Sequence, residues 1–381
     1  MKENLKEIAL DLKNAKYVVE EKKEKNFPIK TQLIYALNGT GKTRLSREFK
    51  SLITPALDIE GSEVGEKKKV LYYNAFTEDL FYWDNGWEND SDPKLKIHPN
   101  IFIPWIFQVQ GDDSKVINTF QYYTKSRITP HFNPQFSEVT FSYRGGNDGY
   151  SDNIKISKGE ESCFIWSIFY SFLSNVIEQL NENESTDLFD DLEYVFIDDP
   201  VSSLDDNNLI ELAVNLAQLI KSSKSNLKFI ITTHNPLFYN VLYNSLEFNI
   251  KNEKITKKYF LKKNENGTYS LITQGSDSPF AYHIFLKNEI ESAIKIGQLK
   301  KYHFNFLRNI LEKTATFLGH GNWSNLLPEN DDKKLKQYQT RIINLSSHSK
   351  HSDYENIELT DEDKNIFIEI FQHLKKQYKF K

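Results

Sequence analysis

Six consecutive residues near the N-terminus have the composition of a phosphate-binding loop, and they are Asn38, Gly39, Thr40, Gly41, Lys42 and Thr43. Glycines let consecutive backbone N–H groups face a phosphate at a helix N-terminus, a lysine can reach the β- and γ-phosphates, and a hydroxyl can bind Mg²⁺. Ala36 stands where the usual pattern has its first glycine, which serves turn geometry, so alanine is tolerable. We predict a nucleotide site here; the simpler alternative is a glycine turn that caps a helix.

A pair of carboxylates follows an apolar run at Tyr194–Ile197. At the end of a strand, Asp198 could lie beside Thr43 and hold Mg²⁺. Asp199 could then lie near the γ-phosphate and orient or deprotonate the attacking water. Aspartates at the end of a strand also have a simpler explanation, because aspartate favours the turn that follows. Together with the phosphate-binding loop, the pair favours the metal interpretation.

Three further segments contain residues that could act on a nucleotide. Ser157 and Glu160 flank Gly159 with the spacing of a helix capping box. Asp205 ends a Ser-Ser-Leu-Asp segment soon after the two carboxylates. His234 ends an apolar run and could sense a γ-phosphate, although a histidine at a strand end is more often structural.

Near the C-terminus, Arg308 and Glu312 are spaced to share one face of a helix. Such a pair is commonly a surface ion pair worth about 0.3–0.5 kcal/mol. His348 follows in a polar turn, and residues 333–350 hold five Lys or Arg and no Asp or Glu. Composition alone favours a solvated basic face for this stretch.

The same three residue types also suffice to cleave RNA through its own 2′-OH. A base takes the 2′ proton, an acid protonates the 5′ leaving oxygen, and an arginine neutralises the charge that builds on phosphorus. DNA lacks the 2′-hydroxyl and could not be cut in this way. The C-terminal region shows no sequence pattern of a metal nuclease, such as C-x-x-C or H-E-x-x-H.

Strand-like and helical patterns alternate between these motifs. The strand-like runs are Gln32–Leu37, Val70–Tyr73, Tyr194–Ile197 and Phe229–Thr232, and the helical patterns include 162–180 and 207–222. The alternation predicts an α/β domain with a mainly parallel sheet. A stretch rich in Asn, Asp, Gly and Pro at about 84–150 predicts an insertion with irregular or antiparallel structure. The Lys- and Glu-rich residues 1–26 predict a solvated helix or arm.

Strand patterns end near Ser276–Pro279, and the rest of the chain is helical in pattern. The helical stretches are 280–318, 333–345 and 361–378. We therefore predict two domains, an α/β domain over 1–275 and a mainly α-helical domain over 276–381.

Composition excludes several classes of protein. Of the 381 residues, 39% are hydrophobic and 27% are charged, which excludes a disordered chain. The one cysteine, Cys163, suits a reducing cytoplasm. A net charge of −5 means that any nucleic-acid contact must come from a local patch. The longest nearly apolar run, Phe164–Leu173, is about half of the roughly 20 residues that a membrane helix needs, so we expect a cytoplasmic protein without a membrane partner.

In order, the nucleotide motifs resemble those of ABC-type ATPases over about residues 30–240. The resemblance implies a head-to-tail dimer that sandwiches nucleotide, with Ser157 and Gly159 contacting the γ-phosphate of the other subunit. It also implies that Asp205 bridges the dimer and that His234 is the switch histidine. The glutamine that follows the loop in this family has two candidates, Gln108 and Gln110.

Two residues depart from that family's pattern. Lys158 replaces the first glycine of the signature sequence, and Asp199 replaces the more usual catalytic glutamate. Because the aspartate is one methylene shorter, it must move or work through a second water. We therefore expect slow turnover, or a hydrolysis rate that serves as a timer.

Seven segments together resemble the bacterial anticodon nucleases of the PrrC family over nearly the whole chain. They are QLIYALNGTGKTRLSREFK, LYYNAFTEDLFYWDN, SKGEES, YVFIDDPVSSLDD, KFIITTHNP, LRNILEKTATFLG and RIINLSSHS. The family joins an ABC-type NTPase to a C-terminal ribonuclease that cuts a tRNA anticodon loop, typically that of tRNA-Lys. The resemblance implies 2′,3′-cyclic phosphate and 5′-hydroxyl ends, with Arg308, Glu312 and His348 as the catalytic residues. His351 is the rival for the histidine role but lies outside the matching segment.

The resemblance also implies how the enzyme is controlled. Mg²⁺ with ATP or GTP would be the cofactor, with GTP hydrolysis and dTTP binding as control inputs. A type I DNA restriction–modification complex would hold the nuclease silent until a phage attacks that complex. The alternative is an ABC-type DNA-maintenance or defence ATPase whose C-terminal helices only bind a partner. A membrane-transporter ATPase fits less well, because the helical domain and the insertion have no use there.

Overall fold

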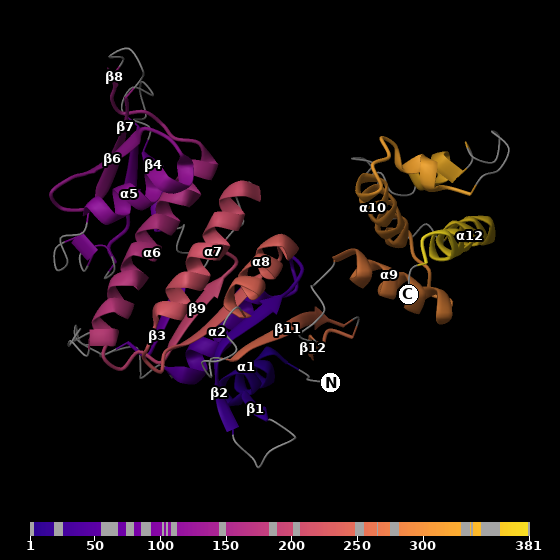
Figure 1. The fold of residues 1–381 in the computed structure, drawn as a ribbon, viewed down its shortest axis with the longest axis horizontal. Coiled ribbons are helices and arrows are strands. Elements are labelled where there is room, and N and C mark those ends of the chain that lie inside the picture. Colours follow the sequence, from indigo (N-terminus) through magenta and orange to yellow (C-terminus); the bar gives the residue numbers. More distant parts are fainter. Residues whose placement is uncertain are drawn as a thin grey trace. The chain divides into compact units, whose positions relative to one another are not determined.

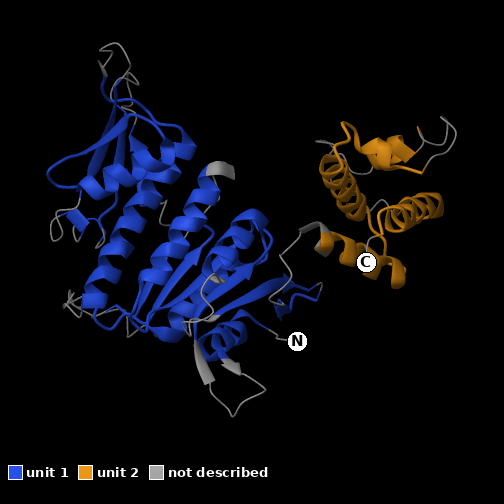
Figure 2. Ribbon diagram, viewed as in Figure 1, with its two compact units in different colours: residues 1–279 blue, residues 280–381 orange. Residues whose placement is uncertain are grey.

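The chain, as a computed structural model, forms two compact units, residues 1–279 and residues 280–381 (Figure 2). The structure describes residues 4–18, 26–54, 68–73, 80–84, 93–100, 103, 106–107, 113–144, 150–182, 189–200, 206–247, 255–264, 266–274, 282–328, 336, 338–343 and 359–379. The prediction that 1–275 hydrolyses a nucleotide and 276–381 cleaves RNA concerns what the units do, and it stays a prediction.

The first unit is built around a seven-stranded sheet with the order β12-β11-β2-β10-β9-β3, in which β1 pairs with β2 (Figure 1). The strands are β1 (Lys16–Val18), β2 (Asn26–Tyr35), β3 (Val70–Tyr73), β9 (Tyr194–Asp198), β10 (Lys228–Thr233), β11 (Ile255–Lys263) and β12 (Tyr269–Thr273). The inner pairs are parallel, whereas β1 and β12 run antiparallel to their neighbours. Each residue of β9 is buried, as expected for a strand covered on both faces.

Six described helices belong to the first unit. They are α1 (Leu5–Asn14), α2 (Lys42–Ile53), α5 (Asp113–Thr124), α6 (Lys158–Glu182), α7 (Asp206–Ser222) and α8 (Pro236–Glu247). α2 packs on the sheet through Phe49, whose ring lies edge-on to Tyr194 with 5.0 Å between the centroids. The expectation of a solvated helix or arm at 1–26 is right about the helix α1 but wrong about its solvation, because its apolar residues Leu5, Ile8, Ala9 and Leu12 are buried in the same core. Their spacing of three and four residues forms one helical stripe.

A second, antiparallel sheet occupies the region predicted as an insertion. Its strands are β4 (Phe81–Asp84), β5 (Lys94–Ile97), β6 (Ile128–Phe132), β7 (Glu138–Arg144) and β8 (Tyr150–Ser151). The order is β4-β5-β7-β6, with β8 paired to β7. The antiparallel alternative for 84–150 is therefore the correct one. Phe141 of this sheet packs edge-on against Phe164 of α6, with the ring centroids 5.1 Å apart.

The second unit is helical, as predicted. Its described elements are α9 (Tyr282–Lys295), α10 (Tyr302–Phe317), the 3₁₀ helix η3 (Trp323–Leu326) and α12 (Asp361–Gln377), and residues 338–343 are also helical. The predicted stretch 280–318 is thus two helices separated by a turn. Phe304 of α10 and Phe367 of α12 are fully buried in their common core, with ring centroids 4.9 Å apart. The predicted fold class, an α/β ATPase domain with an insertion followed by helices, is confirmed.

Replacing Phe49 by alanine tests the packing of the first unit. Phe49 is fully buried, so Phe49→Ala should lower the free energy of unfolding by about 3–5 kcal/mol. Urea denaturation followed by circular dichroism measures the loss. Leu10 is 46% exposed on α1, so Leu10→Ala should change stability by less than about 0.5 kcal/mol. Equal losses in the two variants would contradict this packing.

Candidate functional site

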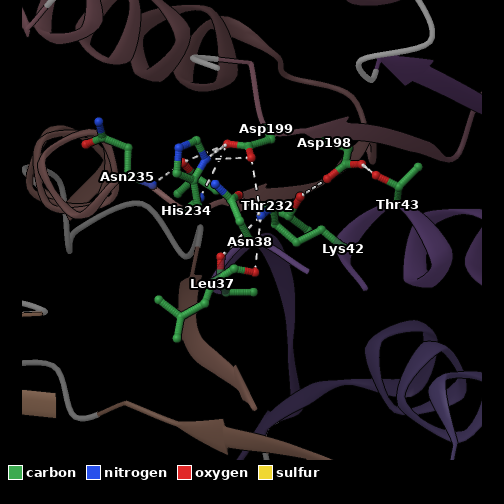
Figure 3. A network of polar contacts seen from close by, with 11 residues as sticks. Leu37, Asn38, Lys42, Thr43, Asp198, Asp199, Thr232, His234 and Asn235 are labelled. Atoms are coloured by element: carbon green, nitrogen blue, oxygen red, sulfur yellow. Dashed lines mark hydrogen bonds and ion pairs between the residues drawn. The ribbon is translucent and has the colours of Figure 1, made fainter. Parts of the chain in front are cut away.

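The candidate nucleotide site lies where three neighbouring strands end. β10 lies between β2 and β9 and is parallel to both. The register places Thr233 opposite Tyr35 on one side, and Thr232 opposite Asp198 on the other. Because parallel strands end at the same edge of a sheet, the segments that follow them converge there. The loop after β2, Asp199 after β9 and His234 after β10 therefore meet (Figure 3).

The phosphate-binding loop has the backbone that its glycines make possible. Gly39 and Gly41 have φ of 76° and 106°, in the left-handed region that other residues rarely adopt. Ala36 is not among the described residues with positive φ, and its N–H donates to the Thr233 carbonyl at 2.9 Å. Alanine is therefore compatible with this position. α2 begins at Lys42, so its N-terminal N–H groups and dipole are directed at the loop.

Lys42 is buried and is held inside the loop. Its Nζ donates to Asn38 Oδ1 at 3.1 Å and to the Ala36 carbonyl at 3.3 Å. The same nitrogen forms an ion pair with Asp199 Oδ2 at 3.3 Å (Figure 3). These acceptors bind the Lys42 ammonium, which the sequence predicts to bind a phosphate. A phosphate of a bound nucleotide must therefore replace Asp199 as the partner of the Lys42 ammonium.

Asp198 is buried beside the first turn of α2. Its Oδ2 accepts a hydrogen bond of 2.7 Å from the Thr43 hydroxyl, and Oδ1 accepts one from the Thr232 hydroxyl. Burial raises the pKa of this carboxyl, although the two hydroxyl donors oppose the shift. The Asp198–Thr43 proximity predicted from sequence is thus present. Thr232 was not predicted; the Thr-Thr pair before His234 was its only sequence signal.

Asp199 lies between two potential cations. Besides Lys42, it accepts a hydrogen bond from His234 Nδ1, with Oδ2 at 2.6 Å. Burial alone would raise the pKa of Asp199, but the His234 hydrogen bond and the Lys42 charge outweigh burial and lower it. Because an ionised carboxylate only accepts hydrogen bonds, His234 must donate through Nδ1, which leaves its Nε2 for a ligand.

The backbone at Asp199 contributes to this arrangement. Its φ is 54°, in the left-handed region, where aspartate is more common than most other residues. Its N–H donates to the Thr232 carbonyl at 2.9 Å, so the turn is fixed to β10. This conformation turns the carboxylate toward Lys42 and His234. Asn235 is the N-cap of α8, because its Oδ1 accepts from the N–H groups of Leu237 and Phe238 in the first turn.

The residues around Thr43 suit a magnesium ion. Mg²⁺ prefers oxygen ligands, and it usually takes one or two from protein together with phosphate oxygens and waters. The Thr43 hydroxyl and the Asp198 carboxylate supply two such oxygens next to the loop. The donor set therefore fits the predicted metal residues, Thr43 and Asp198.

The predicted signature segment is the start of α6. Ser157 Oγ accepts from the Glu160 N–H at 3.3 Å, and Glu160 Oε2 accepts from the Ser157 N–H at 2.8 Å, so the capping box exists. Gly159 lies in the first helical turn. Lys158 Nζ pairs with Glu161 at 2.7 Å, and the other oxygen of Glu161 accepts from the Trp83 indole N–H at 2.9 Å. This link to the antiparallel sheet was not predicted from the sequence.

The predicted ribonuclease pair is also in contact. Arg308 Nε donates to Glu312 Oε1 at 2.8 Å on α10. Both side chains are partly exposed, at 36% and 46%. The helix that carries them is fixed by the fully buried Leu307 and Leu311, each of which precedes one of the pair in the chain.

Several predicted residues lie outside the described residues. They are Asp205, Gln108 and Gln110 for the nucleotide, and His348 and His351 for RNA cleavage. Their roles stay predictions. Within the described part of the chain, no helix has the length and apolar character that crossing a membrane requires.

The strand order, the phosphate-binding loop and the acidic strand end define an ABC-type α/β ATPase domain. A family model described as an AAA domain matches residues 124–374. Over 361 residues the chain is 53% identical to a protein named anticodon nuclease from Escherichia coli, with 91% of this chain and 88% of that relative covered. The chain belongs to the anticodon nuclease family.

Solved structures similar to the chain include heads of SMC proteins. One is an SMC head bound to the C-winged helix domain of ScpA, with 12% identity and a TM-score of 0.36, covering 66% of this chain and 92% of that chain. Another is the SMC head domain from Thermotoga maritima, with 13% identity, a TM-score of 0.28 and the same two coverages.

Lys42→Ala tests the nucleotide site. Without the ammonium, the β- and γ-phosphates lose their main cation, so nucleotide hydrolysis should fall by roughly two to three orders of magnitude. Phosphate release from ATP and GTP measures the effect. Lys50 is an exposed lysine on the same helix, and Lys50→Ala should leave the rate unchanged. Hydrolysis at the wild-type rate in Lys42→Ala would show that the loop does not bind the reacting phosphates.

Proposed function

We propose that the chain cleaves the anticodon loop of a tRNA, typically tRNA-Lys, under the control of its NTPase unit in the cytoplasm. The observation that carries the proposal is the 53% identity to the Escherichia coli anticodon nuclease, which extends over 91% of this chain and so includes both units. The Arg308–Glu312 contact on α10 supports the proposal, because those residue types suit the reaction. Cleavage would leave a 2′,3′-cyclic phosphate and a 5′-hydroxyl.

The proposed reaction needs only proton transfer and charge neutralisation. One of Glu312 and His348 takes the 2′ proton as the 2′-oxygen attacks phosphorus, and the other gives a proton to the departing 5′-oxygen. Arg308 stabilises the negative charge on the phosphoryl oxygens. Arg308 Nε already donates to Glu312, so the pair is oriented before RNA binds. Its partial exposure leaves both groups accessible to a large substrate.

The NTPase unit would control RNA cleavage through a change in the ion-pair partner of Lys42. When a nucleotide enters, Lys42 moves its interaction from Asp199 to phosphate, and Asp199 keeps His234 as a partner. His234 Nε2 can then contact the γ-phosphate while Asp199 orients the attacking water. Thr43 and Asp198 would hold Mg²⁺, which neutralises phosphate charge when it is bound.

The proposed assembly is a nucleotide-sandwich dimer. Ser157 and Gly159 at the start of α6 would contact the other subunit's γ-phosphate, and Asp205 would bridge the subunits. Ser157 is exposed, which leaves it accessible to a second subunit. GTP hydrolysis and dTTP binding would be the control inputs, and a type I DNA restriction–modification complex would keep the nuclease silent until phage infection.

Single substitutions in the ribonuclease triad test the chemistry. Arg308→Ala, Glu312→Ala and His348→Ala should each reduce RNA cleavage by about two or more orders of magnitude, because each removes a transition-state contact or a proton carrier. The losses should be non-additive, since the residues act as a unit. Sequencing of RNA with 5′-hydroxyl ends, together with cleavage rates on an anticodon stem-loop, measures them.

Controls separate this reaction from its rivals. Lys313→Ala, at an exposed position of the same helix, should cleave normally, and His351→Ala should do so too. Replacing the 2′-OH at the cut site by hydrogen should stop cleavage, and EDTA added after assembly should not. Loss of function in His351→Ala with a silent His348→Ala would reassign the histidine. Full activity of all three triad variants would favour an ATPase whose helices only bind a partner.

Ser157→Arg tests the sandwich. The added cation and bulk should block closure on the other subunit's γ-phosphate, while the phosphate-binding loop of the same chain stays intact. Nucleotide affinity, measured by equilibrium binding, should stay near the wild-type value, and hydrolysis should collapse. Ser157→Asn is the matched control, because asparagine caps helices as well as serine does. Unchanged hydrolysis in Ser157→Arg would limit Ser157 to its capping role.

A further inference from the structure

A groove of about 450 Å³ opens along α12 in the second unit. Its lining includes Pro328, Asn365, Ile368, Gln372, His373 and Lys376. The residues from α12 recur at spacings of three and four, so they form one face of the helix. Pro328 follows η3 and forms part of the lining from another segment. Neither the nucleotide site nor the Arg308–Glu312 pair includes these residues.

Charged residues elsewhere on α12 have partners within the unit. Lys375 Nζ donates to Glu291 Oε1 at 2.5 Å, and Asp363 accepts an ion pair from Arg341 at 3.2 Å. Lys364 pairs with Asp361 at 3.5 Å.

The groove residues differ from these. Within the described part of the chain, the side chains of Asn365, Gln372, His373 and Lys376 make no hydrogen bond or ion pair. This set of donors and acceptors therefore remains available to a ligand.

The lining has the chemistry of a site for an unpaired nucleotide. Pro328 and Ile368 offer an apolar surface on which a base can pack, and the Asn365 and Gln372 amides each carry donors and an acceptor for base edges. Lys376 supplies a positive charge for a phosphate. Glu369 also lines the groove, and its carboxylate disfavours a phosphate close to it.

We infer that this groove binds an unpaired nucleotide of the RNA loop that the chain cleaves, with the base on Pro328 and Ile368 and a phosphate at Lys376. The inference rests on the proposed ribonuclease function and assigns part of its substrate recognition. α12 packs on α10 through Phe367 and Phe304, so the groove and the cleaving pair belong to one helical core. A nucleotide held here is fixed to the core that carries Arg308 and Glu312.

Three variants of the full chain test the groove. The ligand is an anticodon stem-loop RNA with a 2′-deoxy nucleotide at the cut site, so that binding occurs without cleavage. The double variant Asn365→Ala/Gln372→Ala should raise the Kd by roughly tenfold or more, because base-edge contacts are lost. Lys376→Ala should weaken binding for all sequences and reduce the slope of log Kd against log salt by about one. Lys364→Ala is the matched control on the same helix and should bind like wild type.

Cleavage kinetics on the unmodified stem-loop separate binding from chemistry. Both groove variants should raise KM and leave kcat within about twofold, because the lost contacts hold the RNA in the ground state and the transition state alike. Nucleotide hydrolysis should be unchanged, which shows that the first unit is folded, and the retained kcat shows the same for the second unit. If the wild-type chain cleaves the stem-loop but the groove variants keep its Kd and KM, the groove does not bind the RNA, and the proposed function still stands. A wild-type chain that neither binds nor cuts the stem-loop would overturn both.

Discussion

The position of β10 between β2 and β9 is the constraint on which the nucleotide site depends. Parallel pairing fixes where each strand ends. The backbone N–H groups of Ala36 and Asp199 also donate to the last two residues of β10, which fixes the segments that follow β2 and β9. Lys42, 6 residues after Ala36, is then close enough to Asp199 for an ion pair at 3.3 Å. The site is therefore assembled by sheet register.

Two adjacent aspartates have different properties because they have different neighbours. Burial raises the pKa of Asp198 against the opposing effect of its two hydroxyl donors, whereas the His234 hydrogen bond and the Lys42 charge outweigh burial at Asp199 and lower its pKa. A carboxyl whose pKa is lowered on folding adds stability above its unfolded pKa, near 4, and loses it as pH falls through the lower folded value. Asp199 is thus ionised throughout the neutral range, as a group that orients water or a cation must be.

The sequence was sufficient for the motifs of the nucleotide site and for the proximity of Asp198 to Thr43, but it was insufficient for contacts that no motif marks. Local spacing predicts the loop, the acidic strand end and the helix that carries Arg308, since these depend on neighbours in the chain. The pairing of β5 with β7 depends on a segment farther along the chain, which local patterns do not reveal, whereas the spacing of the buried apolar residues of α1 is a local signal. Thr232 likewise became part of the site only through its register with Asp198.

Lys158, which departs from the ATPase signature, has a structural explanation in its ion pair with Glu161. Glu161 has a side chain only 6% exposed, and an unpaired carboxylate there would be costly. Lys158 Nζ on one oxygen and the Trp83 indole on the other satisfy it. Glycine at this position could not supply the charge. Glu161, neutralised by this lysine, thus joins the start of α6 to Trp83 of β4, so the segment proposed to contact a second subunit is attached to the antiparallel sheet.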